Sequence, residues 1–321
     1  MTLTELKYIV AVARERHFGK AAEACHVSQP TLSVAVKKLE EELELKLFER
    51  NANEVTVTPL GEEVVRQAQS VLEQAAGIRE IAKRGKDPLA GPLKLGVIYT
   101  IAPYLLPDLV KQVIDLTPQM PLMLQENFTV RLLEMLRVGE IDCAILAEPF
   151  PDAGLAIAPL YDEPFVAAVP RKHALAACKS VSVEQLKLET MLLLGTGHCF
   201  RDHVLEVCPE FARFSGTAEG IQKSFEGSSL ETIKHMVSAG MGVTLVPRLS
   251  VSNEALAAGP ARRKDEDPYI RYLPIVDQGG APPPTRRVVL AWRRSFTRYE
   301  AIAALRNAIY ACELPGVARL S

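Results

Sequence analysis

The chain has 321 residues, of which 48% are hydrophobic and 24% are charged, and its formal net charge is −2. This composition is that of an ordinary soluble protein with room for two or three domains, and it excludes a uniformly basic nucleic-acid-binding protein. The N-terminal residues lack the pattern of a signal peptide, and no apolar run approaches the length of a membrane span. We therefore expect a cytoplasmic protein with no membrane partner.

Residues 1–58 are predicted to form a compact helical unit. A short helix is expected over Gly19–Cys25, and Ser28 is a good N-cap for a third helix with Pro30 in its first turn. Two helices joined by a tight turn are typical of a helix-turn-helix, whose second helix enters the major groove of DNA. In the first helix, apolar residues recur at helical spacing: Leu6, Ile9, Val10 and Ala13.

A polar arc on the third helix and a short strand after it supply the predicted DNA contacts. Val55–Thr58 alternates like a strand and, with Arg50, indicates a wing that contacts backbone phosphates. The residues expected to meet DNA are Gln29, Pro30, Thr31, Ser33, Lys37 and Arg50.

The same region resembles the DNA-binding domain of LysR-type transcriptional regulators. The matching motifs are Phe18-x-x-Ala21-Ala22, Val27-Ser28-Gln29-Pro30-Thr31-Leu32-Ser33, and Lys38-Leu39-Glu40-x-x-Leu43-x-x-x-Leu47-Phe48-x-Arg50. The chain departs from the family in two places: Glu44 replaces the usual glycine, and Asn51-Ala52-Asn53 is poorer in arginine than most wings. The resemblance implies a winged helix-turn-helix that binds double-stranded operator DNA, with RNA polymerase as a further partner.

Residues 59–84 are predicted to form one long linker helix, and the breakers in residues 85–92 mark a hinge. A solitary helix with an apolar stripe needs a partner, and its copy in a second subunit is the simplest one. In the resembled family this helix dimerises, which implies a homo-oligomer, most simply a tetramer built as a dimer of dimers. The stripe consists of Leu60, Val64, Ala68, Val71, Leu72, Ala75, Ile78 and Ile81.

From Leu93 onward strands and helices alternate, which predicts a parallel α/β sheet that binds ligands at the carboxyl ends of its strands. The pattern resembles the two-lobed, periplasmic-binding-like regulatory domain of the same family. We assign residues 93–164 and 268–321 to subdomain I and residues 165–267 to subdomain II, with Tyr269–Ile275 returning the chain to subdomain I. Strands are expected at Leu93–Ile98, Leu122–Glu126, Cys143–Leu146, Phe165–Val169, Met191–Leu194, Val243–Val246 and Val288–Trp292.

Cys199 and Cys208 form a candidate redox switch. Glycines precede Cys199 and no helix breaker occurs in Arg201–Val207, which predicts a helix beginning at Cys199. In a helix the two Cα atoms lie about 13 Å apart, whereas a disulfide requires roughly 4.4–6.8 Å. The cysteines can therefore form a bridge only if the helix unwinds.

Two other interpretations of this segment are open from the residues alone. Two buried cysteines that only pack are common in intracellular proteins. A zinc site is the second alternative, but the spacing of His198, Cys199, His203 and Cys208 matches no zinc motif, so we expect no metal and no cofactor. The remaining cysteines are expected to pack as small apolar residues: Cys25, Cys143, Cys178 and Cys312.

The run from Gly197 to Asp202, together with Cys208, is similar to the redox loop of the hydrogen-peroxide-sensing branch of the LysR family. The resemblance implies that Cys199 is the peroxidatic thiol, that Cys208 resolves it to a disulfide, and that a thiol reductant such as a glutaredoxin recycles the pair. It also assigns peroxide binding or thiolate support to Thr100, Thr129, His198, Arg201 and Asp202. His203 is expected on a solvated helix face.

Two rival functions differ in class from a peroxide-sensing regulator. A LysR-type regulator of a small metabolite would carry the cysteines incidentally and would ignore peroxide. A thiol peroxidase would consume peroxide continuously, but a DNA-binding domain on the same chain argues against an enzyme.

Overall fold

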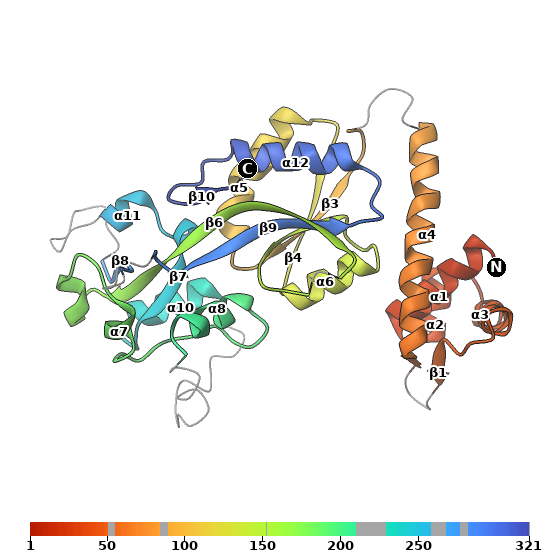
Figure 1. The fold of residues 1–321 in the computed structure, drawn as a ribbon, viewed down its shortest axis with the longest axis horizontal. Coiled ribbons are helices and arrows are strands. Elements are labelled where there is room, and N and C mark those ends of the chain that lie inside the picture. The colour runs from red at the N-terminus through yellow and green to blue at the C-terminus, as the bar shows by residue number, and fades with distance from the viewer. Residues whose placement is uncertain are drawn as a thin grey trace.

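The computed structural model describes residues 1–50, 55–83, 89–151, 153–209, 229–257, 268–276 and 282–320. A helical domain at the N-terminus is joined by one long helix to a larger regulatory domain of two lobes (Figure 1). Within these ranges, no helix is both long enough and apolar enough to cross a membrane.

The N-terminal domain is a winged helix-turn-helix, as the sequence predicted. Ser28 accepts a hydrogen bond from the Thr31 N–H and caps the third helix, and Pro30 lies in its first turn. Glu44 ends that helix in the left-handed conformation (φ 52°), where the resembled family usually has a glycine. The elements are α1 (Leu3–Glu15), α2 (Phe18–Ala24), α3 (Gln29–Leu43) and the antiparallel wing strands β1 (Phe48–Arg50) and β2 (Val55–Val57).

The linker helix α4 (Pro59–Lys83) packs against α1, and Val65 and Ala68 complete the core of the N-terminal domain. Leu60, Val71 and Ile78 remain exposed. Part of the predicted apolar stripe is thus buried within the chain, and part stays open on the surface of a single chain. Of the predicted hinge, residues 85–88 lie outside the described residues.

The first lobe, lobe I, is a sheet covered by helices. Its strand order is β10-β6-β9-β5-β3-β4. The sheet is mixed rather than parallel, because β9 runs antiparallel to both of its neighbours. The elements are β3 (Leu93–Ile98), α5 (Ala102–Leu116), β4 (Leu122–Asn127), α6 (Thr129–Arg137), β5 (Cys143–Ala147), β6 (Leu155–Pro170), β9 (Thr285–Arg293), α12 (Tyr299–Ala311) and β10 (Ala318–Arg319).

The second lobe, lobe II, is built on the far half of the long strand β6. Residues Phe165–Pro170 of β6 pair with two further strands, so that β6 belongs to both lobes (Figure 1). The elements are η1 (Ala174–Ala177), α7 (Val183–Leu186), α8 (Cys199–Val207), α10 (Leu230–Ser238), β7 (Thr244–Pro247), η3 (Arg248–Ser250), α11 (Asn253–Ala257) and β8 (Ile270–Pro274).

Two sequence expectations for lobe II were wrong. Tyr269–Ile275 does not return the chain to subdomain I: β8 pairs with β6, and Ile270 and Leu273 are buried in the core of lobe II. The return is made by β9 instead. Met191–Leu194 is not a strand of its own, since Met191 makes only an isolated bridge to Val243.

A buried carboxylate connects α3, the second helix of the helix-turn-helix, to the wing. Glu40 accepts hydrogen bonds from the backbone N–H groups of Leu47 (2.8 Å) and Phe48 (3.2 Å), and it pairs with Lys46. Glu40 is 7% exposed, so these two amides have little access to water as an alternative partner.

We predict that Glu40→Ala destabilises the N-terminal domain by about 1–3 kcal/mol, because it leaves two buried amides unsatisfied. Hydrogen exchange measured by mass spectrometry on the whole protein should show faster exchange in the peptide containing Leu47 and Phe48. Glu41→Ala is the matched control, since Glu41 forms only an exposed pair with Lys37. If the peptide containing Leu47 and Phe48 exchanged at the same rate in Glu40→Ala and Glu41→Ala, Glu40 would not hold the wing.

Candidate redox site

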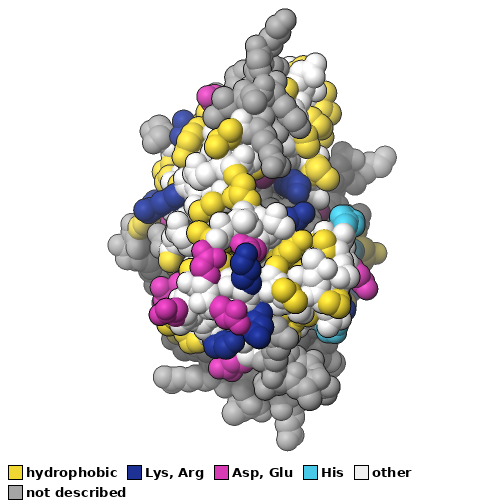
Figure 2. Space-filling view, turned by 90° about the vertical axis from the view of Figure 1, so that its right-hand side faces the viewer, with side chains coloured by type: hydrophobic (Ala, Val, Ile, Leu, Met, Phe, Trp, Pro, Cys, Tyr) yellow, Lys and Arg dark blue, Asp and Glu magenta, His cyan; other side chains and the backbone are white. Residues whose placement is uncertain are grey.

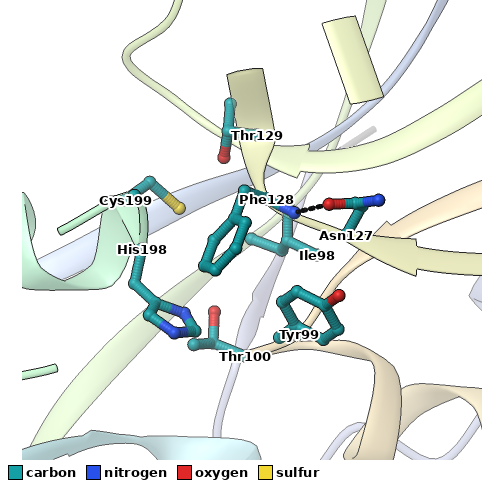
Figure 3. A pocket seen from close by; sticks show the side chains of 9 residues that line it. Ile98, Tyr99, Thr100, Asn127, Phe128, Thr129, His198 and Cys199 are labelled. Carbon is teal, nitrogen blue, oxygen red and sulfur yellow. Dashed lines mark hydrogen bonds between the residues drawn. The ribbon is translucent and has the colours of Figure 1, made fainter. Parts of the chain in front are cut away.

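A small cavity lies where the carboxyl ends of β3 and β4 meet the N-terminus of α8. Its volume is about 10 Å³, close to the space that one water molecule requires. In Figure 3 the Cys199 sulfur, both threonine hydroxyls and the His198 ring are directed toward a common space. The lining residues are Ile98, Tyr99, Thr100, Asn127, Phe128, Thr129, Gly197, His198 and Cys199.

Cys199 is the first residue of α8, where the sequence predicted the helix to begin. Its thiol is partly buried, and burial raises the pKa of Cys199 above that of an ordinary cysteine. The Thr129 hydroxyl, the Arg286 guanidinium and the Phe200 backbone N–H oppose this shift because they stabilise the thiolate. At neutral pH the Cys199 side chain is therefore mainly the protonated thiol, although the groups around it favour its ionisation.

The two predicted threonines are both buried at the cavity, but their hydroxyls have different surroundings. Thr100 Oγ1 accepts a hydrogen bond from Arg286 Nη1 at 2.8 Å. Thr129 Oγ1 makes no hydrogen bond of ordinary geometry with any residue that the structure describes, although it lies close enough to Cys199 to favour the thiolate. The Thr129 hydroxyl is therefore available to a small polar ligand in the cavity.

Arg286 is a central residue of the site that the sequence did not reveal. It is 2% exposed, and it forms a buried ion pair with Glu163 in which Nε lies 2.8 Å from Oε2. Its guanidinium also donates to the Thr100 carbonyl and stacks 5.2 Å from the Phe200 ring centroid. Arg286 thus supplies positive charge near Cys199 and fixes the position of Thr100.

His198 precedes the helix and is 7% exposed. Its ring packs edge to face on Phe128 with centroids 4.8 Å apart, and it lies near Tyr99. Burial lowers the pKa of His198, so the ring is neutral at pH 7. A neutral imidazole carries one donor and one acceptor, which suits contact with either a peroxide oxygen or the sulfur.

The structure bears on three further predictions near Cys199, and two of them, for Asp202 and His203, need correction. Arg201 donates to the Leu194 carbonyl at 3.0 Å and so holds the preceding loop, while its support of the thiolate stays a prediction. Asp202 is exposed and raises the pKa of Cys199, which opposes thiolate formation. His203 is buried rather than solvated: its Nε2 lies 2.7 Å from the Glu148 carbonyl oxygen, and burial lowers the pKa of its ring.

The helix α8 connects the two lobes. Cys199 packs against the core of lobe I, whereas its neighbour Phe200 and also Val204 are buried in the core of lobe II. Cys208 lies at the far end of α8, buried in lobe II. All six cysteines are thiols in this structure. Because the helix between Cys199 and Cys208 is intact, unwinding is required before the two can bond.

The four remaining cysteines lie outside this site. Cys25, Cys143 and Cys312 are buried within hydrophobic cores, and Cys178 is partly buried. Burial raises the pKa of Cys25, Cys143 and Cys312. Thiols of this kind react poorly, in agreement with the packing role expected from the sequence.

The predicted DNA-contacting arc lies on the open side of α3. Gln29, Pro30, Thr31 and Lys37 are exposed and Ser33 is partly exposed, while Arg50 ends β1. Val34, which the sequence did not single out, is 69% exposed on the same helix. Figure 2 views the molecule from the side of the N-terminal domain and α4, where basic and acidic side chains are interspersed. The predicted wing residues 51–53 lie outside the described residues.

Comparison with known proteins agrees with this architecture. Residues 3–62 match the bacterial regulatory helix-turn-helix protein family of lysR type, and residues 86–311 match the LysR substrate binding domain. The chain is 38% identical over 306 residues to the DNA-binding transcriptional dual regulator OxyR of Escherichia coli K12, covering 94% of both chains. It is 37% identical over 307 residues to a probable hydrogen peroxide-inducible genes activator of Mycobacterium avium, covering 95% of this chain and 93% of the other.

Solved structures give the same result. A full-length OxyR mutant from Pseudomonas aeruginosa is 49% identical, with a TM-score of 0.77, and the match covers 98% of this chain and 96% of that one. A Corynebacterium glutamicum OxyR mutant with hydrogen peroxide bound is 32% identical, with a TM-score of 0.60, covering 97% and 92% of the two chains. The chain therefore belongs to the LysR family of bacterial transcriptional regulators, and within that family it is similar to OxyR.

We predict that the oxidation rate of Cys199 by peroxide rises with pH through the neutral range, because its raised pKa keeps most of the thiol protonated there. In the double variant Glu163→Gln/Arg286→Gln the lost positive charge raises that pKa further. At neutral pH the thiolate fraction, and with it the rate, should then fall about tenfold for each pH unit by which the pKa rises, and the profile should move to higher pH. Stopped-flow kinetics across a pH series measures both.

Arg287→Gln is the matched control, since Arg287 is an exposed neighbour on β9 that pairs with Asp162. It should leave the profile unchanged. A double variant whose rate falls equally at every pH would show that Arg286 positions Thr100 without affecting the ionisation of Cys199.

Proposed function

We propose that this protein is a DNA-binding transcriptional regulator that senses hydrogen peroxide through a reversible Cys199–Cys208 disulfide and controls oxidative-stress genes. The observation that carries the proposal is the cavity of about 10 Å³ in which the Cys199 sulfur meets the hydroxyls of Thr100 and Thr129. The proposal is supported by relatives named hydrogen peroxide-inducible genes activators and by the similar peroxide-bound structure.

The chemistry proceeds in two balanced steps. The Cys199 thiolate attacks one peroxide oxygen, the O–O bond breaks, and the other oxygen leaves as hydroxide that takes a proton to form water. The Cys208 sulfur then attacks the sulfenic acid on Cys199; the S–S bond forms, the S–O bond breaks, and a second water leaves. Two thiols are oxidised and one peroxide is reduced. A dithiol of the glutaredoxin type supplies the two electrons that restore the thiols.

The described side chains have distinct tasks in the first step. The Thr129 hydroxyl is the open hydrogen-bonding group for peroxide, and Thr100 is held in place by Arg286. Neutral His198 donates a hydrogen bond to the departing oxygen. Arg286 raises the thiolate fraction of Cys199. Together these groups orient peroxide for attack by the sulfur.

Disulfide formation has a structural cost. Unwinding α8 withdraws Phe200 and Val204 from the core of lobe II, at about 1.5–3 kcal/mol for each large side chain exposed. It also removes the hydrogen bond between His203 and the Glu148 carbonyl, which spans 55 residues of sequence. Oxidation by peroxide is strongly favourable and offsets these losses. The contacts of α8 with both lobes therefore change together.

The division of the chain follows from the same proposal. Residues 1–58 bind operator DNA, residues 59–84 form the linker and dimerisation helix, and residues 85–92 form the hinge. Lobe II begins at residue 165, and its last described strand is β8. We further propose that the protein acts with RNA polymerase, is located in the cytoplasm and assembles as a tetramer. The exposed apolar residues of α4 support pairing with a second copy.

The rival functions fit the site less well. A metabolite effector needs a pocket of some hundreds of cubic ångströms, far more than the cavity at Cys199 holds. A peroxidase needs fast turnover, whereas each cycle here requires α8 to unwind and refold. The cavity and the helix together therefore favour a sensor.

We predict that Cys199→Ser abolishes the response to peroxide, whereas Cys208→Ser forms the sulfenic acid and does not trap it as an intramolecular disulfide. A dimedone label followed by mass spectrometry should mark Cys199 in the second variant and nothing in the redox segment of the first. Cys178→Ser is the control, since Cys178 is partly buried and lies outside the site. Labelling of Cys208 in the first variant would reverse the two roles.

We predict that Lys37→Ala weakens binding to all DNA sequences alike and lowers the salt slope by about 0.9. Ser33→Ala should instead reduce the preference for operator over unrelated DNA. Fluorescence anisotropy over a salt series measures both effects. Lys94→Ala removes the same charge from exposed Lys94 in lobe I and should change neither quantity. Wild-type affinity and slope in both α3 variants would rule out the proposed DNA contacts.

A further inference from the structure

The linker helix α4 lies against its own regulatory domain along one narrow stripe. Gln69, Glu73 and Gly77 are four residues apart and therefore face the same side of the helix. Gln69 meets Gly139, Glu73 meets Arg293 and Ser295, and Gly77 meets Thr297. We name the surface formed by Gly139, Arg293, Ser295 and Thr297 the linker seat.

A nearly buried ion pair lies at the centre of this contact. Arg293 Nε is 2.5 Å from Glu73 Oε1, and the two side chains are only 8% and 14% exposed. The contact is an ion pair rather than an aligned hydrogen bond. Glu73 also accepts from Ser295 Oγ at 2.6 Å. Ion pairs removed from water in this way are sensitive to geometry, because losing either partner leaves an uncompensated buried charge.

Two glycines allow the helix to approach the seat closely. A Cβ atom on Gly77 would lie 3.1 Å from both Cγ2 and Oγ1 of Thr297. A Cβ atom on Gly139, which has a φ of 72°, would clash with the Gln69 amide. A glycine inside a helix costs about 1 kcal/mol relative to alanine. The close fit against Thr297 accounts for the presence of Gly77 in α4.

Arg293 also organises the seat itself. Its guanidinium donates to the carbonyl oxygens of Leu136 and Ile141, which flank the turn that carries Gly139. Arg293 therefore holds that turn and the linker helix at the same time. If Arg293, the turn that carries Gly139 and the helix α4 do not move together, the bonds of Arg293 to the other two are lost.

The strand β9 connects the linker seat to the redox site. Arg286 lies near one end of β9 and Arg293 at the other, about 23 Å apart at 3.3 Å per residue. Arg286 contacts Thr100 and the ring of Phe200 in α8. Both arginines are buried, and β9 is hydrogen-bonded on both sides, by β5 and β6. A displacement of β9 caused by unwinding of α8 would therefore reach the seat.

We propose that the linker seat sets the angle between α4 and lobe I and so carries the redox state of Cys199 and Cys208 to the DNA-binding domain. Glu73 and Arg293 are its positioning residues. This inference rests on the proposed function and adds the residues through which the signal passes.

The test compares Glu73→Gln and Gly77→Leu with Glu63→Gln, which removes the same charge from an exposed position of α4. Each full-length protein is examined with and without peroxide. Mass spectrometry gives the rate of disulfide formation, and footprinting with titration gives the operator footprint and affinity. In both seat variants the disulfide forms at the wild-type rate, but the footprints of the two redox forms become alike. The ratio of their affinities moves toward one by at least about fivefold.

Glu63→Gln should retain the full wild-type difference. The proposal is overturned if Glu73→Gln and Gly77→Leu also retain it. It is equally overturned if disulfide formation fails in Glu73→Gln, because Glu73 would then support the folding of lobe I rather than the coupling. A wild-type protein whose footprint ignores peroxide would instead overturn the proposed function on which this inference rests.

Discussion

The buried pair of Glu163 and Arg286 is the interaction on which the redox site depends. Glu163 is fully buried and also accepts from the Leu249 backbone N–H, so the pair is held by polar partners on both sides. An arginine without its carboxylate would be too costly to bury, because an unpaired buried charge destabilises a protein by about 3–5 kcal/mol. Glu163 therefore allows a positive charge to stand beside Thr100 and near Cys199, where it opposes the effect of burial on the thiol.

The position of the site between the lobes follows from the shared strands. The long strand β6 carries Glu163 where it passes from one lobe to the other, and β9 brings Arg286 alongside it. Lobe I supplies Thr100 from the turn after β3 and Thr129 from the first position of α6, and α8 supplies the thiol from lobe II. A change confined to nine residues of α8 therefore alters contacts in both lobes.

Local signals predicted much of this arrangement. Ser28 and the glycines before Cys199 marked the starts of α3 and α8, because caps and breakers act on their immediate neighbours. Thr100 and Thr129 were found from the family resemblance and from their places after strands. Arg286 was missed because its partners, Glu163 and Thr100, lie 123 and 186 residues away, and an Arg-Arg pair before a strand carries no local signal of a site. His203 was misplaced for the same reason: only the packing of the two lobes buries it. β8 was assigned to the wrong lobe because an apolar strand pattern does not identify its partner strand.

Burial raises the pKa of the Cys199 thiol and leaves only a small space beside its sulfur. That cavity, of about 10 Å³, is far smaller than a bulky oxidant such as a disulfide. The raised pKa of Cys199 keeps the resting side chain mainly protonated and therefore slow to react with other electrophiles. Peroxide in the cavity would meet the open Thr129 hydroxyl and neutral His198, groups that can receive or donate the proton that the thiol must lose. Ionisation of the Cys199 thiol is therefore favoured when peroxide occupies the cavity. A thiol that reacts slowly at rest can in this way still react quickly with peroxide.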